Sequence, residues 1–302
     1  MKTVRSICTA VALAAATIGG GYVGSSVYTQ NYEEAQALSR RQQLNNILGA
    51  TQEVVVFGNY HIEEIHPATG PREFYKEIRS GGSAVAVHRD EEGRVYFLTS
   101  HHVVQNEKDF VQTRMIQVAP FIVVPATRKH TLLEEKFGIK EYETEDDIGM
   151  ETLELLAVSE PTLPTDFESS MNYQDLALLR TKDPTPYSFW KGPWAEKLYT
   201  GDDLVSAGYT KEWDKHLIDG ILRSVNDPTI PDTIHPTTLP IMRGYSGGGV
   251  YRRNSSGDYE FAGLNVAIMG HPNMGGITPV HHIRQFLKSA GYEHIIRGDS
   301  RE

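Results

Sequence analysis

The stretch Gly244-Tyr245-Ser246-Gly247-Gly248-Gly249 places a serine in the middle of a glycine-rich loop. Two fragments upstream complete it. Residues 98–104, LTSHHVV, are typical of a buried strand that ends in a histidine pair, and residues 174–179, QDLALL, put an aspartate at the start of an apolar strand. A histidine, an aspartate and a serine in this chain order can form a nucleophilic triad. A glycine-rich serine loop alone is weak evidence because such loops are common in turns, so the prediction depends on all three fragments.

The three residue types suit one another chemically. A serine hydroxyl is a weak nucleophile until a base takes its proton, so a histidine must lie within hydrogen-bond reach. The histidine needs a carboxylate on its other ring nitrogen, which fixes the tautomer and stabilises the imidazolium. Glycines beside the serine allow a tight backbone whose N–H groups converge on one point, where the oxyanion of a tetrahedral intermediate can bind.

These fragments resemble the motifs of the trypsin-like serine peptidases, which have the chymotrypsin fold, and in particular those of the bacterial branch that includes the HtrA and Deg proteases. The family pattern around the histidine, L-T-x-x-H-V, is matched by residues 98–103. The D-L-A-L-L strand is matched by residues 175–179 and the G-x-S-G-G motif by residues 244–248. Residues 261–267 resemble the G-I-N-x-A strand that lines the substrate cleft, and residues 276–280 resemble the family's C-terminal close.

The resemblance implies a role for each matched residue. His102 would be the general base, Asp175 the carboxylate that orients it, and Ser246 the nucleophile. The backbone N–H groups of Gly244 and Ser246 would form the oxyanion hole. This chemistry needs no metal and no organic cofactor.

Two other residues compete for these roles. His101 is an alternative base, but His102 stands directly before the two valines, as the family pattern requires. Asp147 is an alternative acid, but it lies in an acidic stretch, which is a poor place for a buried carboxylate. Asp175 opens an apolar strand instead, so we expect His102 and Asp175 to form the pair.

The chain also departs from the family pattern. Tyr245 precedes the serine, where animal digestive members carry an aspartate that pairs with a newly cleaved N-terminus, and a phenol cannot be that counter-ion. No I-V-G-G sequence follows a basic site, so activation by such an ion pair is not expected. The interval of 73 residues between His102 and Asp175 is long for the family. About fifteen residues follow Leu287, so we expect no regulatory peptide-binding (PDZ) domain after the body.

In the family, the pocket for the side chain before the cleaved bond lies between the residues just ahead of the serine and the strand after the G-I-N glycine. The residues expected there are Pro240, Ile241, Met242, Asn265, Ala267 and Ile268. None is a carboxylate that could receive Lys or Arg, so we expect a small or medium aliphatic side chain in this pocket. His271 and His281 leave an acidic preference open, because a histidine can pair with a glutamate.

The body of the chain predicts an all-β fold. From residue 51 onward, short β-rich runs alternate with Gly, Pro, Asp and Asn. Strands are expected at residues 53–57, 83–88, 95–99, 112–118, 121–125, 175–180, 204–208, 217–225, 248–252 and 260–268. Apolar residues spaced three or four apart predict an amphipathic helix over residues 279–290, with a proline in its first turn. With the resemblance, this gives two antiparallel six-stranded β-barrels, a C-terminal helix and an N-terminal helical and export segment.

We expect the peptidase domain to occupy residues 51–290. An export segment at 1–30 and a helical stalk or linker at 31–50 would precede it, and a short tail at 291–302 would follow. Residues 134–160 hold ten acids against two lysines and predict a solvated surface loop inserted in the domain. A calcium-binding or partner-recognition insertion is the alternative, although no EF-hand pattern is present.

Composition excludes several classes of protein. The formal net charge of -10 argues against a nucleic-acid partner, and a hydrophobic content of 39% indicates a globular body. Cys8 is the only cysteine, so the body has no disulfide, no thiolate nucleophile and no cysteine metal ligand. The histidines show no spacing such as H-E-x-x-H, and we therefore expect no metal site.

The N-terminus predicts export. Lys2 and Arg5 precede a stretch with no charged residue until Glu33. Its most apolar part, residues 7–18, has the length of the apolar region of a signal peptide and is short for a membrane span. A cleaved signal peptide is the favoured interpretation, and an uncleaved anchor that contacts a membrane through residues 6–30 is the alternative. In both cases the body would lie outside the cytoplasm, as a periplasmic, secreted or membrane-anchored protein.

The sequence therefore predicts an exported serine endopeptidase that acts on polypeptides through an acyl-enzyme at Ser246. One alternative is a catalytically silent homologue that binds a partner. Another is an esterase of small molecules, but the α/β-hydrolase elbow would put the serine first in chain order and alternate strands with helices, unlike this chain. The sequence indicates no oligomeric state.

Overall fold

The computed structural model describes residues 23–66, 69–105, 109–119, 122–143, 148–159, 175–210, 215–225, 232–268 and 274–297. The chain divides into two compact units, residues 1–45 and 46–302. Helix α2 (Val23–Ala50) includes the predicted stalk, and residues 1–22 of the predicted export segment lie outside the described residues. None of the helices in the described ranges is both long enough and apolar enough to cross a membrane.

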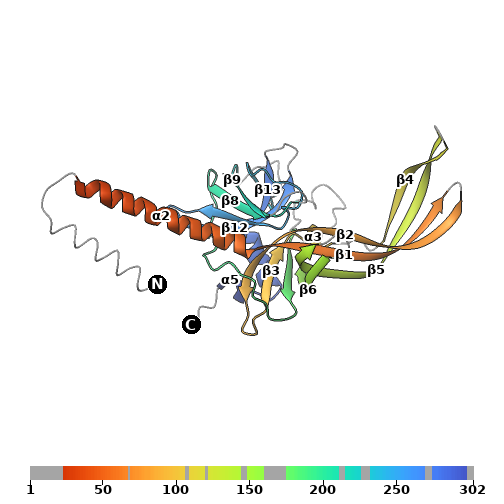
Figure 1. Ribbon diagram of the computed structural model, residues 1–302, viewed down its shortest axis with the longest axis horizontal. Coiled ribbons are helices and arrows are strands. Elements are labelled where there is room, and N and C mark those ends of the chain that lie inside the picture. Colours follow the sequence, from red (N-terminus) through yellow and green to blue (C-terminus); the bar gives the residue numbers. More distant parts are fainter. Residues whose placement is uncertain are drawn as a thin grey trace. The chain divides into compact units, whose positions relative to one another are not determined.

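Six strands of the second unit close into an antiparallel barrel (Figure 1). They run in the order β1-β2-β3-β7-β6-β5, and β1 pairs with β5 to close the ring. A seventh strand, β4, pairs with the outer edge of β5. The bounds are β1 (Thr51–His66), β2 (Gly70–Arg89), β3 (Val95–Thr99), β4 (Asp109–Ala119), β5 (Ile122–Glu143), β6 (Ile148–Val158) and β7 (Ala177–Thr181).

The interior of this barrel is aliphatic. Alternate residues of each strand point inward, because successive side chains of a strand lie on opposite faces. Val54 and Val56 of β1, Ala84 and Ala86 of β2, and Phe97 of β3 are all fully buried in one cluster. This packing fixes the register of β2 and β3, since a slip of one residue would turn the apolar side chains outward.

The second sheet has six strands in the order β10-β13-β12-β11-β8-β9. An isolated bridge between Leu222 and Thr237 brings its two ends together, so the sheet forms a half-barrel. Its bounds are β8 (Asp203–Gly208), β9 (His216–Ile221), β10 (His235–Thr237), β11 (Gly249–Arg253), β12 (Tyr259–Ile268) and β13 (Gly275–Pro279). The predicted pair of six-stranded antiparallel barrels is confirmed, although β6, β10 and β13 were not among the predicted strands.

The C-terminal helix is also confirmed. Helix α4 (Val280–Ser289) buries Val280, Ile283, Phe286 and Leu287, the apolar residues that predicted it. Pro279 is its N-cap, where the missing N–H of proline costs no hydrogen bond. Two further helices, α3 (His101–Val104) and α5 (His294–Arg297), are a single turn each.

The prediction of a surface loop at residues 134–160 is wrong. Residues up to Glu143 continue β5, and β6 begins at Ile148. Ile139 and Leu153 are buried in the core of the barrel, whereas Glu154 faces outward and forms an ion pair with Arg180 at 2.7 Å. Among the described residues, exposed acids such as Glu141 and Glu154 therefore belong to two barrel strands, and the many charges obscured the alternating apolar pattern in the sequence.

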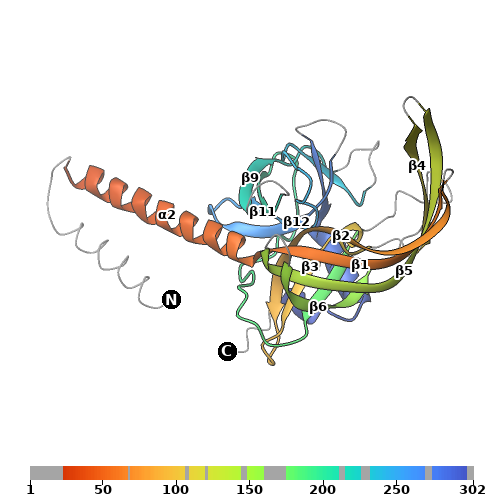
Figure 2. The ribbon, with the colours of Figure 1, turned by 45° about the vertical axis from the view of Figure 1, so that its right-hand side comes forward.

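Strands β1, β2 and β5 run far beyond the predicted segments and form an arm with β4 (Figure 2). The arm consists of residues 58–66, 70–78, 109–119 and 122–134. Its strands carry charged residues on both faces, with cross-strand contacts from His61 to Glu73 at 3.5 Å and from Lys129 to Glu63 at 3.9 Å. Residues 112–118 and 121–125 of the arm were predicted as strands. The extensions of β1 and β2 and the rest of β5 were not predicted, because runs rich in charged residues give a weak strand signal.

The strand assignment of the acidic segment makes a stability prediction. Ile139 is fully buried and Leu133, on the same strand, is 57% exposed. Ile139→Ala should lower the free energy of unfolding by about 2–5 kcal/mol because it leaves a cavity, and Leu133→Ala should change it by about 0.5 kcal/mol or less. Urea unfolding followed by tryptophan fluorescence measures both. Equal effects of the two substitutions would contradict the placement of β5 in the barrel.

Candidate active site

His102 and Asp175 are joined by two hydrogen bonds. Nδ1 of His102 lies 2.5 Å from Oδ2 of Asp175, and the His102 backbone N–H donates to Oδ1 at 2.8 Å. Asp175 is 7% exposed, just ahead of β7, while the imidazole of His102 is 43% exposed. One carboxylate thus holds both the main chain and the ring of the histidine, and leaves Nε2 for a reacting group.

The turn that carries His102 is fixed by its own sequence. β3 ends at Thr99, whose hydroxyl donates to the Ser83 carbonyl at 2.7 Å. The Ser100 hydroxyl donates to the Asn265 carbonyl at 3.0 Å, and the Val103 N–H closes the turn on the Ser100 carbonyl at 3.1 Å. Two short hydroxyl side chains therefore fasten the start of α3 to both sheets.

His101 has a different environment. It is 8% exposed, and its Nδ1 has no hydrogen-bond partner among the described residues. Burial lowers the pKa of His101, which favours the neutral ring. The structure brings His102, and not His101, to Asp175. The other alternative, Asp147, lies outside the described residues.

The serine loop follows β10 and leads into β11. Gly244 has φ +100° and Gly247 has φ +82°, conformations that side chains other than glycine rarely adopt. The Ser83 N–H donates to the Ser246 carbonyl at 2.8 Å. The Ser83 hydroxyl donates to the Gly244 carbonyl at 2.7 Å and accepts the Tyr209 N–H at 2.8 Å. A single buried serine of β2 therefore holds both carbonyls that flank Tyr245.

Ser83 was not among the predicted site residues. The available signal was the Gly81-Gly82-Ser83 run directly before an apolar strand. A Cβ at Gly82 would lie 2.8 Å from both the Ser246 carbonyl oxygen and a Val103 methyl group, so only glycine allows this approach.

The serine loop packs against the segment that leads to the histidines. A Cβ on Gly247 would lie only 2.1 Å from Oγ1 of Thr99 and 2.9 Å from the Ser100 nitrogen. Ser246, one residue earlier, is half-buried. Within the described chain, no hydrogen bond joins Oγ of Ser246 to His102. Such contacts are often long in a free enzyme and tighten with substrate, so the missing hydrogen bond does not exclude proton transfer.

Two backbone N–H groups are available beside Ser246. Over the part of the chain that the structure describes, neither Gly244 nor Ser246 donates its N–H to another group. The carbonyl oxygens of the same residues are both held by Ser83. Free N–H groups in a fixed loop can stabilise a developing oxyanion, which is how acyl-transfer sites lower their barrier.

Tyr245 is buried and makes the serine loop rigid by packing. Its ring lies 5.2 Å from that of His216 at 84°, and a Cβ on Gly208 would meet the ring at 2.6 Å. The phenol donates to the His216 carbonyl at 3.4 Å, and burial raises the pKa of Tyr245, so the phenol stays neutral. The position before the serine is thus held by an aromatic core contact instead of an ion pair.

The residues expected in the substrate pocket are only partly brought together. Ile241 is buried and Met242 is 39% exposed just ahead of the serine loop. Asn265 is fully buried, and its amide donates to the Ser206 hydroxyl at 2.6 Å, so its side chain is directed into the second sheet. Pro240 is half-buried, and Ala267 and Ile268 lie on β12 with side chains outside the described part.

Three of the described histidines lie close together near the start of α4. His281 packs on His282 at 4.2 Å and lies 5.7 Å from His235, and His271 lies outside the described residues. In the described ranges, no group of three or more His, Cys, Asp or Glu side chains could hold a metal ion.

Comparison with known proteins places this geometry in context. A sequence model described as "Trypsin-like peptidase domain" matches residues 82–257, a range that includes His102, Asp175 and Ser246. A solved structure titled as the HtrA-type protease AlgW with a decapeptide aligns at 18% identity and a TM-score of 0.49, over 83% of this chain and 67% of that one. No curated protein matches the chain.

The contacts of Tyr245 predict how the serine loop responds to substitution. Tyr245→Ala should lower the free energy of unfolding by about 3–5 kcal/mol because it empties a fully buried site. Tyr245→Phe should lower it by about 1 kcal/mol or less because it removes a single long hydrogen bond. Urea unfolding of the two variants beside the parent measures both values. Equal losses would show that the hydroxyl, and not the ring, holds the loop.

Proposed function

Because the chain belongs to the trypsin-like peptidase family, whose sequence model matches residues 82–257, we propose that it is a serine endopeptidase acting through His102, Asp175 and Ser246. The observation that carries the proposal is the contact of 2.5 Å between Nδ1 of His102 and Oδ2 of Asp175. A carboxylate at one ring nitrogen makes the other nitrogen a base of the right tautomer.

The first half of the reaction forms an ester on the enzyme. Nε2 of His102 takes the proton of the Ser246 hydroxyl while the oxygen attacks the peptide carbonyl carbon. The carbonyl oxygen becomes an oxyanion, which accepts hydrogen bonds from the N–H groups of Gly244 and Ser246. The C–N bond then breaks, and His102 gives its proton to the leaving amine.

The second half releases the acid. A water molecule gives a proton to His102 and attacks the acyl carbon, and a second oxyanion forms in the same place. The ester bond breaks, the proton returns to Ser246, and the peptide leaves as a carboxylic acid. Asp175 neither gains nor loses a proton during the reaction, and it stabilises the imidazolium of His102.

We also propose that the pocket before the cleaved bond takes a small or medium aliphatic side chain. Ile241 and Met242 supply apolar surface ahead of the serine loop. No carboxylate stands in the expected wall to receive a basic side chain.

Export is a separate proposal. The chain begins with Lys2 and Arg5 and has no further charge before Glu33, the pattern of a signal peptide or an N-terminal anchor. The peptidase domain would then act outside the cytoplasm, with residues 6–30 either removed or in contact with the membrane.

Peptide turnover tests the proposed function. Peptides with alanine or valine before the scissile bond should be cleaved, and Ser246→Ala or His102→Ala should lower kcat by about 10⁴–10⁶, since the triad acts as a unit. Asp175→Asn should lower kcat by about 10⁴ through the wrong tautomer. His101→Gln is the matched control and should stay within about tenfold of the parent, because the hydrogen bonds of Asp175 go to His102 and not to His101.

Two outcomes would contradict the proposal. A folded parent that cleaves no peptide would identify a silent homologue that binds its partner. Turnover of simple esters without any peptide cleavage would identify an esterase.

A further inference from the structure

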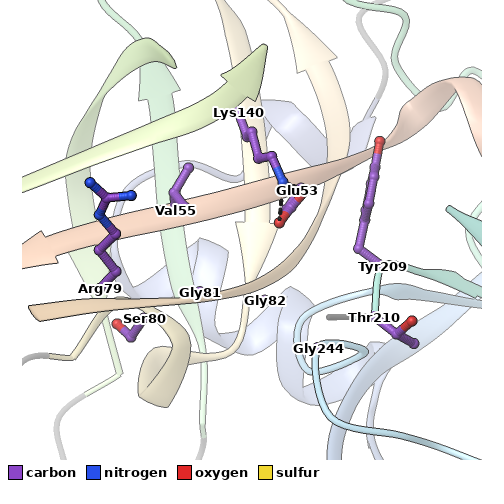
Figure 3. Close-up of a pocket in the computed structure, with 10 residues that line it drawn as sticks. All are labelled: Glu53, Val55, Arg79, Ser80, Gly81, Gly82, Lys140, Tyr209, Thr210 and Gly244. Atoms are coloured by element: carbon purple, nitrogen blue, oxygen red, sulfur yellow. Dashed lines mark hydrogen bonds and ion pairs between the residues drawn. The ribbon is translucent and has the colours of Figure 1, made fainter. Parts of the chain in front are cut away.

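A cavity of about 200 Å³ opens beside the serine loop (Figure 3). Its walls come from β1, β2 and β5 of the first barrel and from the turn after β8. The lining residues are Glu53, Val55, Arg79, Ser80, Gly81, Gly82, Lys140, Tyr209, Thr210 and Gly244. Arg79 and Tyr209 stand at opposite ends, with Lys140 and Glu53 between them (Figure 3).

The cavity begins where the proposed reaction takes place. Gly244, whose N–H is a proposed oxyanion donor, lines it, and so does Gly82, against which the Ser246 carbonyl packs. A group bound in the cavity would therefore lie beside the scissile carbonyl.

The composition of the walls shows which part of a substrate would enter. None of the lining residues belongs to the expected pocket for the side chain before the cleaved bond, which lies at residues 240–242 and 265–268. That pocket takes the acyl side of the substrate, and a cavity that shares no wall with it but borders the oxyanion donor Gly244 fits the other side of the scissile bond. The segment that departs with the amine would pass over it.

The charges of the lining are unequal. Glu53 supplies the only carboxylate, and Lys140 and Arg79 supply two cations. Nζ of Lys140 lies 3.2 Å from Glu53, so this pair is close to neutral. Nε of Arg79 donates to Glu77 at 2.8 Å, whereas its two terminal nitrogens make no hydrogen bond within the described residues. A guanidinium with free terminal N–H groups can bind a carboxylate in a fork.

Lys215 supplies a third cation, next to the Tyr209 ring that lines the cavity. Nζ of Lys215 lies 5.4 Å from the centre of the Tyr209 ring and donates to the Thr51 carbonyl at 2.7 Å. No acidic side chain in the described ranges forms an ion pair with Lys215. With Glu77 counted beside Glu53, the charged groups at the cavity are three cations, Arg79, Lys140 and Lys215, against two carboxylates. The cations are therefore in excess by one, in a chain whose net charge is -10.

We propose that this cavity is the subsite for the leaving-group segment and that it selects an acidic side chain, Asp or Glu, from the first residues after the cleaved bond. The proposal rests on the proposed peptidase function and adds its substrate class. Arg79 would bind the carboxylate, Tyr209 would cover its methylene groups, and Glu53 would oppose binding by charge. Removal of Arg79 and removal of the Glu53 charge should therefore act in opposite directions.

Paired peptides that differ only by Glu or Gln after the cleaved bond test the subsite at low ionic strength. The parent should cleave the Glu peptide with a kcat/KM about five- to tenfold above that of the Gln peptide. Arg79→Met should bring this ratio close to one, and Glu53→Gln should raise it above the parent value. Lys129→Met removes a cation of the arm with similar exposure and should leave the ratio unchanged.

The outcomes separate this proposal from the one on which it rests. Cleavage of both peptides at equal rates, or a ratio that neither Arg79→Met nor Glu53→Gln alters, would overturn the subsite and leave the peptidase function intact. If the folded parent cleaves no peptide, both proposals fall. A ratio that Lys129→Met lowers as much as Arg79→Met would show a general charge effect and would also overturn the subsite.

Discussion

The hydrogen bonds of Ser83 are the constraint on which the site depends. Ser83 belongs to the first barrel, and its N–H and hydroxyl hold the carbonyls of Ser246 and Gly244 in the loop of the second sheet. With both carbonyls held, the N–H groups of the same two residues remain free beside the serine. Ser83 is fully buried, so breaking one of these hydrogen bonds would leave a polar group with neither a protein partner nor water. This cost favours the one arrangement of the two sheets in which the hydrogen bonds form.

Polar contacts of the same kind position the base. Thr99 and Ser100 connect the end of β3 to Ser83 and Asn265, and Asp175 holds the ring and the backbone of His102. Asn265 also accepts the Gly247 N–H at 2.7 Å, so one residue of β12 links the serine loop to the histidine turn. One connected set of hydrogen bonds therefore positions the serine loop and the histidine turn. Tyr245 also holds the serine loop, through the packing of its ring against His216.

The sequence was most informative where residue type is dictated by chemistry. The three motifs predicted the fold, and the structure brings two of their residues, His102 and Asp175, into contact. The role of Ser246 as nucleophile stays a prediction. Ser83 was missed because its role depends on which strand faces the serine loop, a fact of tertiary structure. The acidic residues of β5 and β6 were wrongly assigned to a loop, and the arm portions of β1 and β2 were missed, since strands whose exposed faces are charged lose the apolar pattern. The cavity with Arg79 and Tyr209 joins three strands and a turn, and no local pattern predicts it.

The most direct test of the account is the reaction of the folded protein with a fluorophosphonate, which labels a serine only where a base and an oxyanion site activate it. We expect the label on Ser246 of the parent and of His101→Gln, identified by mass spectrometry of the labelled peptide, and none on Ser246→Ala or His102→Ala. A folded parent that stays unlabelled, or a label on any other serine, would contradict the claim that His102 and the serine loop together activate Ser246.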